Sequence, residues 1–221
     1  MDKIRILIAD DHNVVREGTR QLLEQEPDLE VIAEAADGEE AIHLTGTTSP
    51  DVVLMDVAMP KVDGISATKQ IKALYPKTTI LVLSAFDDDQ FVFSLLEAGA
   101  AGYLLKSVRG RELVEAIRAV HAGESVLHPT VARKVLNKFV PVTGKTVKDK
   151  SNEVLSEREL DVLRLASRGL SNQEIADKFS LSLRTVQAHF SHIFNKLQVS
   201  SRTEAVVRAL KEGWVTLDDL P

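Results

Sequence analysis

Four short apolar stretches of the chain each end at polar residues whose side chains could handle a phosphate group. These residues are Asp10, Asp11, Asp56, Ser84 and Lys106. If the stretches are parallel strands of one sheet, the five side chains meet at its carboxyl edge, where open α/β sheets bind their ligands. Three carboxylates, a hydroxyl and an ammonium group in one crevice therefore predict a site for a divalent cation and a phosphoryl group.

The three carboxylates favour a bound cation, because two like charges about 4 Å apart repel by roughly 4 kcal/mol at an effective dielectric constant of about 20. Mg²⁺ is the predicted cofactor, since it binds oxygen atoms of one or two carboxylates together with phosphate oxygens. Asp56 ends a central strand, so we expect it to be the nucleophile that forms an acyl phosphate. Lys106 would pair with the phosphoryl charge, and Ser84 would donate a hydrogen bond to it.

Each of these residues also has an ordinary structural interpretation. An aspartate at a strand end is usually a turn former or a helix cap, and a lysine after a strand is usually solvated. The phosphate interpretation rests on the fact that all five residues occur together, at the ends of four successive apolar stretches.

Strand and helix patterns alternate through roughly the first 120 residues. The predicted strands are residues 4–9, 29–35, 52–55, 80–83 and 102–105. The first predicted helix begins after Asp11 and ends near Pro27, and the other helices cover residues 38–44, 65–74, 87–98 and 111–121. Residues 45–50 are predicted to form a loop. Such alternation is typical of parallel βαβ units. The predicted fold is a doubly wound, five-stranded parallel α/β sheet of the flavodoxin type, followed by a small all-α domain.

The composition excludes several classes of protein. The 221 residues contain no cysteine, which excludes a disulfide framework, a zinc–thiolate site and thiol catalysis. Charged residues interrupt the apolar N-terminal segment, so we expect no signal peptide, and no stretch approaches the roughly 18 apolar residues of a membrane span. We expect a cytoplasmic protein without a membrane partner.

Charge is unevenly distributed along the chain, whose net charge is −6. Residues 1–127 carry 12 Lys and Arg against 22 Asp and Glu, whereas residues 128–221 carry 15 against 11. An acidic half and a mildly basic half indicate two modules with different partners. The expected domains are residues 1–121 and 151–217, joined by a linker of residues 122–150 that includes an amphipathic helix over residues 128–139.

Only helical patterns follow residue 151. Two capping boxes, Ser156–Glu159 and Ser171–Glu174, begin the first two predicted helices. Ser182 caps a third, which ends at Leu197, and residues 202–213 form a fourth. The second and third helices are joined by a short turn and are therefore a helix-turn-helix candidate.

The third of these helices has an apolar face and a polar face. At 100° per residue, Val186, Phe190, Ile193 and Leu197 lie together and are expected to face the core. The opposite face suits the major groove of DNA, although the solvated face of a small helical bundle would have the same composition. The candidate DNA-contact residues are Asn172, Lys178, Ser182, Arg184, Thr185, Gln187, Ala188, Ser191, His192, Asn195, Lys196 and Arg202.

Residues 1–121 resemble a response-regulator receiver domain. The resemblance is carried by Ala9–His12, Met55–Pro60, Asp63-Gly64, Ser84-Ala85 and Gly99–Lys106. It implies that a sensor histidine kinase phosphorylates Asp56. The implied magnesium ligands are Asp10, Asp11, Asp56 and the carbonyl group of Ala58. The resemblance further implies that Ser84 and Tyr103 form a switch pair, although Tyr103 could also be an ordinary half-buried strand aromatic.

Residues 151–215 resemble a LuxR-type DNA-binding domain. The resemblance is carried by Leu155–Glu159, Val162-Leu163, Gly169–Ala176, Thr185-Val186, His189, Lys196-Leu197, Val199 and Arg202. Together with the receiver domain, this is the layout of NarL/FixJ-type response regulators. It implies a transcriptional regulator that is activated by phosphorylation of Asp56, forms a homodimer and binds double-stranded promoter DNA.

Two positions depart from the LuxR pattern, since Gln187 and Ser191 stand where basic residues are common. Fewer phosphate contacts predict a shallower salt dependence of DNA binding, and Gln187 is suited to read adenine. The fourth helix resembles the family's dimerisation helix through its apolar residues, and packing within the domain is the alternative. These residues are Ala205, Val206, Ala209, Leu210 and Trp214.

A phosphohydrolase with an aspartyl-phosphate intermediate is the main competing function. Enzymes of the haloacid-dehalogenase type carry a second aspartate two residues after the nucleophile, and Ala58 occupies that position here. A Rossmann nucleotide binder needs a glycine-rich loop after the first strand, which Asp10–Asn13 does not provide. We therefore expect that the protein is not an enzyme acting on other molecules. The only reactions it would catalyse are the Mg²⁺-dependent phosphorylation and dephosphorylation of its own Asp56.

Overall fold

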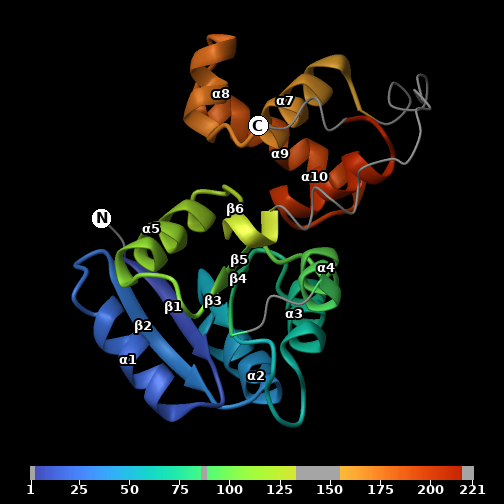
Figure 1. Ribbon diagram of the computed structural model, residues 1–221. Helices are drawn as coiled ribbons and strands as arrows, with labels where there is room; N and C mark the ends of the chain where they lie inside the picture. Colours follow the sequence, from blue (N-terminus) through green and yellow to red (C-terminus); the bar gives the residue numbers. More distant parts are fainter. Residues whose placement is uncertain (1–2, 86–88, 133–154, 216–221) are drawn as a thin grey trace.

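The computed structural model describes residues 3–85, 89–132 and 155–215, which form a sheet domain and a helical domain in contact with each other (Figure 1). The strands are β1 (Ile4–Ala9), β2 (Leu29–Ala35), β3 (Val52–Met55), β4 (Thr79–Ser84), β5 (Gly102–Leu105) and β6 (Val126–Leu127). The helices of the sheet domain are α1 (Asn13–Leu23), α2 (Gly38–Thr48), α3 (Gly64–Leu74), α4 (Asp89–Glu97) and α5 (Gly110–His121). The helical domain contains α7 (Glu157–Ser167), α8 (Asn172–Phe179), α9 (Leu183–Leu197) and α10 (Arg202–Lys211). Within these ranges, no helix has the length and apolar character needed to cross a membrane.

The strands pair in parallel in the order β2-β1-β3-β4-β5-β6. This order confirms the predicted doubly wound parallel sheet, in which each of the five predicted strands is present. A sixth strand is added at the edge, because the two residues of β6 pair with Gly102 and Tyr103 of β5. The prediction of only five strands was wrong, since a strand of two residues is too short to show periodicity in the sequence.

Both faces of the sheet are buried, which explains why the strands read as unbroken apolar runs. Leu7 and Val53 belong to the hydrophobic cluster under α2, α3 and α4, whereas Ile6 and Ile8 belong to the cluster under α1 and α5. Since all neighbouring strands run in the same direction, the residues that follow β1, β3, β4 and β5 lie along one edge of the sheet.

Helix α2 is longer than predicted, because it includes residues 45–48 of the expected loop. The hydroxyl groups of Thr45 and Thr48 each donate a 2.7 Å hydrogen bond to the carbonyl group four residues earlier, so these threonines are satisfied inside the helix. Gly46 lies under Tyr75, where an added Cβ atom would approach the tyrosine hydroxyl oxygen to 2.3 Å. The small residue thus permits tight packing rather than marking a turn. The helix ends at Ser49, which adopts a left-handed conformation.

The linker prediction is described only in part. Residues 129–132 begin a helix directly after β6, within the predicted helix over residues 128–139. The remainder of that helix and the polar segment up to residue 150 lie outside the described residues.

The helices of the C-terminal domain begin at the predicted capping residues. Glu159 accepts a 2.7 Å hydrogen bond from the Ser156 backbone, and Glu174 accepts one of 2.7 Å from the Ser171 backbone. Ser182 caps α9 through the backbone N–H of Thr185. These caps confirm the predicted capping boxes and fix the turn between α8 and α9. Val162, Ile175, Val186, Ile193 and Ala205 form part of the core that the four helices share.

Candidate functional site

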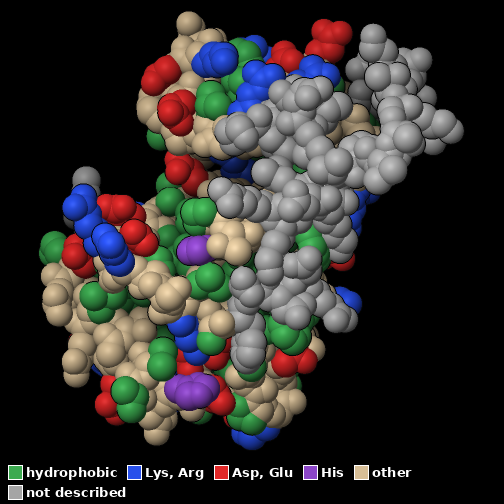
Figure 2. Space-filling model, viewed as in Figure 1, with side chains coloured by type: hydrophobic (Ala, Val, Ile, Leu, Met, Phe, Trp, Pro, Cys, Tyr) green, Lys and Arg blue, Asp and Glu red, His purple; other side chains and the backbone are tan. Residues whose placement is uncertain are grey.

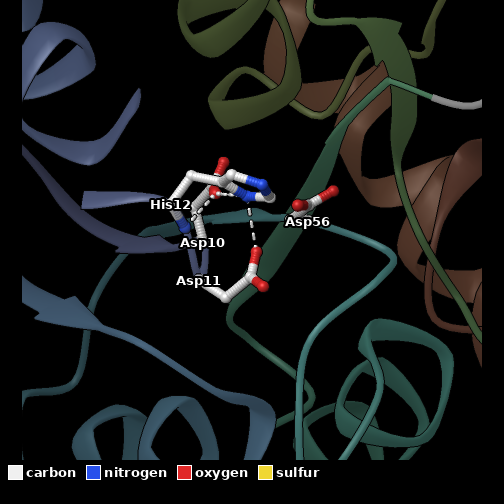
Figure 3. Close-up of side chains that lie close together, drawn as sticks. All are labelled: Asp10, Asp11, His12 and Asp56. Carbon is white, nitrogen blue, oxygen red and sulfur yellow. Dashed lines mark hydrogen bonds and ion pairs between the residues drawn. The ribbon is translucent and has the colours of Figure 1, made fainter. Parts of the chain in front are cut away.

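Four side chains with metal-binding groups gather at the carboxyl edge of the sheet (Figure 3). They are Asp10, Asp11, His12 and Asp56, and one ligand atom of each lies within 4.8 Å of the others. Asp10 and Asp56 converge because β1 and β3 are neighbours in register, with Ala9 opposite Met55. The two carboxylates are only 3% and 4% exposed, respectively. The structure thus brings together the three predicted acidic residues.

Lys106 joins this cluster from the end of β5. Its Nζ atom lies 2.6 Å from Oδ2 of Asp10 and 2.7 Å from Oδ2 of Asp56. Burial raises the pKa of Asp56, and the bond from Lys106 opposes this rise without cancelling it. Burial alone would lower the pKa of Lys106, but its bonds to Asp10 and Asp56 raise it, so the ammonium form is favoured. One ammonium group is therefore shared between two buried carboxylates.

The donor set fits a magnesium ion. Carboxylate oxygens are hard ligands, and Mg²⁺ is held by few protein groups and keeps several waters. Asp56 Oδ1 is oriented by a 2.7 Å hydrogen bond from the Val57 backbone, and Ala58, two residues later, is exposed. Asp11 is paired with His12, whose Nδ1 atom lies 2.7 Å from the carboxylate.

The loop after Asp56 folds tightly over the strand end. The backbone N–H of Gly64 donates a 2.9 Å hydrogen bond to the carbonyl group of Val57. A Cβ atom at Gly64 would lie 2.0 Å from the carbonyl oxygen of Asp56, so only glycine allows this approach. Lys61 ties the same loop to α2 through a 2.6 Å ion pair with Asp37. The loop that carries Ala58 is therefore closed by the Gly64 hydrogen bond and tied to the start of α2 by Lys61.

Ser84 of β4 and Tyr103 of β5 are both fully buried. Ser84 ends β4, and its carbonyl group accepts a 2.7 Å hydrogen bond from the Lys106 backbone. The alternative interpretation of Tyr103 expected a half-buried strand aromatic, but the side chain is fully buried. It belongs to the hydrophobic cluster under α4. Both residues thus connect the strand ends to the α4 side of the sheet.

A second group of candidate functional residues lies on α9 of the helical domain. Val186, Phe190, Ile193 and Leu197 are buried, as the periodicity predicted. The predicted contact residues on the opposite surface are exposed. They are Ser182, Arg184, Gln187, Ala188, Ser191, His192, Asn195 and Lys196, with Lys178 exposed on α8 and Thr185 half-buried. Leu183, at the helix N-terminus that was expected to assist phosphate contacts, is also 42% exposed.

Comparison with known proteins connects both sites to a family. Residues 6–118 match the response regulator receiver domain, and residues 153–209 match the LuxR family of bacterial regulatory proteins. The chain is 44% identical to the transcriptional regulatory protein LiaR of Bacillus subtilis (strain 168), over 93% of this chain and 96% of LiaR. This protein is a response regulator of the NarL/FixJ type. The layout expected from the sequence is thereby confirmed.

Solved structures of response regulators show the same organisation. The response regulator ChrA of a haem-sensing two-component system is 34% identical, with a TM-score of 0.53 over 97% of this chain and 100% of ChrA. A structure of two RcsB dimers bound to two parallel DNAs is 27% identical, with a TM-score of 0.56 over 96% of this chain and 99% of RcsB. The similarity therefore extends through both domains of the regulator.

The response regulator positions its acidic site with residues that sequence reasoning missed. Arg16 of α1 donates hydrogen bonds of 2.5 Å to the carbonyl group of Asp10 and 2.6 Å to the side chain of Asn13. It thereby fixes the loop that carries Asp11. A signal was present, because Arg16 follows Asn13 at the three-residue spacing that lets side chains of a helix meet.

Two predicted DNA contacts lie in the interior of the response regulator instead. Asn172 and Arg202 are 3% and 4% exposed. The Asn172 amide donates a 3.2 Å hydrogen bond to the carbonyl group of Ala122 and accepts one of 3.1 Å from Arg202. Arg202 also donates to the carbonyl groups of Ala166 and Leu170, and burial lowers its pKa to about 10. Their side chains therefore hold helices together in this arrangement and do not face the surface of α9.

Proposed function

We propose that a sensor histidine kinase transfers a phosphoryl group to Asp56 of this response regulator, and that the phosphorylated protein dimerises and binds promoter DNA. The observation that carries this proposal is the position of Lys106 between the buried carboxylates of Asp10 and Asp56. A fixed ammonium group beside a strand-end carboxylate supplies the charge that a phosphoryl group needs.

The proposed transfer uses few protein groups. Asp56 Oδ1 is held by the Val57 backbone, and Oδ2 faces Lys106. As a carboxylate oxygen bonds to phosphorus, the bond from phosphorus to the kinase imidazole nitrogen breaks, and the imidazole leaves and takes up a proton. Lys106 neutralises the arriving charge, and Ser84 donates a hydrogen bond to it. Mg²⁺, held by Asp10, Asp11, Asp56 and the Ala58 carbonyl, would neutralise phosphoryl oxygens when bound.

This chemistry is confined to the protein itself. Ala58 stands two residues after Asp56 and offers no acid or base to the leaving group of an outside substrate. We therefore propose phosphorylation and slow hydrolysis at Asp56 as the only reactions, with the acyl phosphate acting as a signal.

DNA binding is proposed for the exposed surface of α9. Arg184, Gln187 and Asn195 lie on this surface and match the donor and acceptor patterns of base edges in the major groove. Lys178 and Lys196 are exposed and are proposed to contact phosphates, for which Lys196 would exchange its 2.7 Å ion pair with Glu159 for a DNA phosphate. The similarity to RcsB, which was solved as dimers on DNA, supports a dimeric DNA complex. Because the protein is proposed to bind promoters, we propose a cytoplasmic location. The proposed domains are a receiver of residues 1–121 and a DNA-binding domain of residues 151–217, joined by a linker of residues 122–150.

The phosphoacceptor assignment is tested with acetyl phosphate and Mg²⁺. We expect intact mass spectrometry to show the addition of one phosphoryl group, and Asp56→Asn to abolish it. Asp177→Asn, at an exposed position of the helical domain, is the matched control and should accept the group like the wild type. Chelation of Mg²⁺ should also prevent the reaction. Phosphoryl addition that persists in Asp56→Asn would contradict the assignment.

A further inference from the structure

The loop between β3 and α3 presents the carbonyl group of Ala58, one of the four groups proposed to hold Mg²⁺. Its residues, 57–63, form neither helix nor strand, so no regular ladder of hydrogen bonds fixes the direction of that carbonyl group. The Ala58 side chain is exposed and has no polar atom that could orient its own backbone. Burial of Met59 against the core anchors the loop, but apolar contact has no direction. Other residues of the loop must therefore orient the carbonyl group.

Lys61 forms the tight turn of this loop. Its backbone φ angle is 59°, in the left-handed region that residues other than glycine disfavour. A residue of this kind keeps such a conformation only where surrounding contacts hold it. The turn at Lys61 therefore depends on the contacts that its side chain and its neighbours make.

The Lys61 side chain pairs with Asp37 at the start of α2. Its Nζ atom lies 2.6 Å from Oδ2 of Asp37, a side chain that is only 8% exposed. Oδ1 of Asp37 accepts a 2.8 Å hydrogen bond from the backbone N–H of Glu40, so it caps α2. Each oxygen of the carboxylate thus has its own partner, and the capped helix holds the anion in one place for Lys61.

The backbone makes a second connection at the same place. The N–H of Gly38 donates a 3.1 Å hydrogen bond to the carbonyl group of Val62. A Cβ atom at Gly38 would lie 2.2 Å from that carbonyl oxygen, so glycine permits the close approach. Two successive residues of the loop are thus attached to two successive residues at the start of α2.

The start of α2 is in turn attached to the acidic cluster. The backbone N–H of Asp10 donates a 3.1 Å hydrogen bond to the carbonyl group of Ala35, which ends β2 two residues before Asp37. Asp10 and the Ala58 loop are therefore both attached to one short segment, residues 35–38. Through this segment, the pair of Lys61 and Asp37 sets the position of one proposed ligand group relative to another.

The carboxyl edge of the sheet is open to ions from solvent. The arrow of β2, which is parallel to the other strands, points toward the end of the receiver that lies away from the helical domain (Figure 1). A histidine side chain and acidic side chains are visible together on the surface of that end (Figure 2). Among the residues of the site, the His12 and Asp11 side chains are 66% and 33% exposed. Ions therefore reach the site directly, and its affinity depends on how well its groups are positioned.

We propose that Lys61 is a positioning residue for Mg²⁺, and that its pair with Asp37 gives the site its preference for Mg²⁺ over Ca²⁺. Mg²⁺ demands near-octahedral ligands at about 2.0–2.1 Å, whereas Ca²⁺ accepts about six to eight oxygen ligands in flexible arrangements. A loosened Ala58 carbonyl group should therefore weaken Mg²⁺ binding more than Ca²⁺ binding. The inference rests on the proposed function, because it takes the carboxylates of Asp10, Asp11 and Asp56 and this carbonyl group as the ligands.

The test measures Mg²⁺ and Ca²⁺ binding to the full chain by titration calorimetry, without a phosphoryl donor. Lys61→Gln removes the cation at a side chain that is 63% exposed, and Asp37→Asn removes the anion but keeps a residue that caps helices. We expect each variant to bind Mg²⁺ about tenfold more weakly, and Ca²⁺ less than about threefold more weakly.

Two control variants accompany this measurement. Lys61→Arg retains the cation and should bind both ions like the wild type. Lys77→Gln makes the same change as Lys61→Gln at an exposed position just before β4, at the opposite edge of the sheet, and is the matched control. It should also bind both ions like the wild type.

The signs of the two changes separate positioning from simple electrostatics. If Lys61 and Asp37 acted only through their charges, removal of the cation would strengthen Mg²⁺ binding and removal of the anion would weaken it. Positioning predicts a loss in both, and the double variant should lose no more than either single variant. Unchanged or tighter Mg²⁺ binding by Lys61→Gln would overturn the inference, as would equal losses for Mg²⁺ and Ca²⁺.

Labelling of Asp56 by acetyl phosphate is a separate measurement. Mg²⁺ binding that depends on Lys61, in a chain that acetyl phosphate does not label, would reject the proposed phosphorylation but not the positioning. Labelled Asp56 together with a Mg²⁺ affinity that Lys61→Gln leaves unchanged would reject the positioning alone.

Discussion

Among single residues, Lys106 has the largest influence on the acidic site. The strand-end carboxylates were predictable, because Asp10 and Asp56 each follow an apolar run that ends at one edge of the sheet. The bonds of Lys106 to both carboxylates were not predictable in detail. They depend on β4 lying between β3 and β5, across which the long side chain extends. Local sequence therefore indicates which residues meet, whereas the sheet order determines how their charges are paired.

Replacement of Lys106 by alanine should expose the repulsion between the two carboxylates. Both are nearly fully buried, so loss of their shared ammonium group should cost about 3 kcal/mol of unfolding free energy in Mg²⁺-free buffer. Mg²⁺ should restore much of this loss, because it supplies the missing positive charge. Urea unfolding with and without Mg²⁺ measures both values. Lys69→Ala, at an exposed position of α3, should change neither, and an equal loss for Lys106→Ala under both conditions would contradict this explanation.

At the scale of elements, helix starts were predicted better than helix ends. Ser156, Ser171 and Ser182 each cap the helix that the sequence assigned to them, because capping uses contacts within three residues. The end of α2 was misplaced, since the threonines there bond inside the helix and Gly46 is packed under Tyr75. Strand β6 was missed because only pairing with β5 defines it. These errors concern contacts that local sequence patterns do not encode.

The capping box of α7 should make the stability of the helical domain depend on pH. Glu159 is buried, which alone would raise its pKa, but bonds from Lys196 and Ser156 outweigh burial and hold the pKa below its usual value. The carboxylate therefore stabilises the fold above the pKa of the unfolded chain, and this stabilisation is lost as pH falls through the lower folded pKa. We expect Glu159→Gln to cost about 1–2 kcal/mol at neutral pH and progressively less in acid.

Chemical unfolding at several pH values, followed by Trp214 fluorescence, measures this difference. Glu174→Gln in the capping box of α8, where Ser171 supplies the bonds, is the comparison and should show a smaller loss. A loss in Glu159→Gln that does not vary with pH would argue against the carboxylate as its source.

At the scale of the whole molecule, contact between the domains changes the role of residues that the sequence places on DNA. Asn172 begins α8 and Arg202 begins α10, and both were predicted to contact DNA. In the structure, Asn172 instead bonds to Ala122 at the end of α5, and Arg202 is enclosed among helices of its own domain. No local pattern predicts this, because the partner of Asn172 lies in the other domain. Exposure of α9, in contrast, follows from helix periodicity alone.

The docked arrangement should be visible in the unfolding of the DNA-binding domain. The single tryptophan of the chain, Trp214, lies just beyond α10, whereas both tyrosines lie in the receiver, so the two domains have separate fluorescent reporters. Docking adds its free energy to the DNA-binding domain as long as the receiver is folded. Val207 of α10 packs in the hydrophobic cluster under α4, and the hydroxyl groups of Ser201 and Thr203 donate hydrogen bonds to the carbonyl groups of Ala100 and Ala101, so docking should contribute about 1–2 kcal/mol. Glu97→Arg with Ser125→Lys removes the ion pair with Lys211 and the hydroxyl partner of Thr203. At low protein concentration, where dimers are absent, this variant should therefore lower the tryptophan-detected stability by about that amount. Glu39→Arg with Thr47→Lys, at exposed positions of α2, should leave it unchanged, and equal tryptophan midpoints in all three proteins would show that the receiver does not hold α10 in solution.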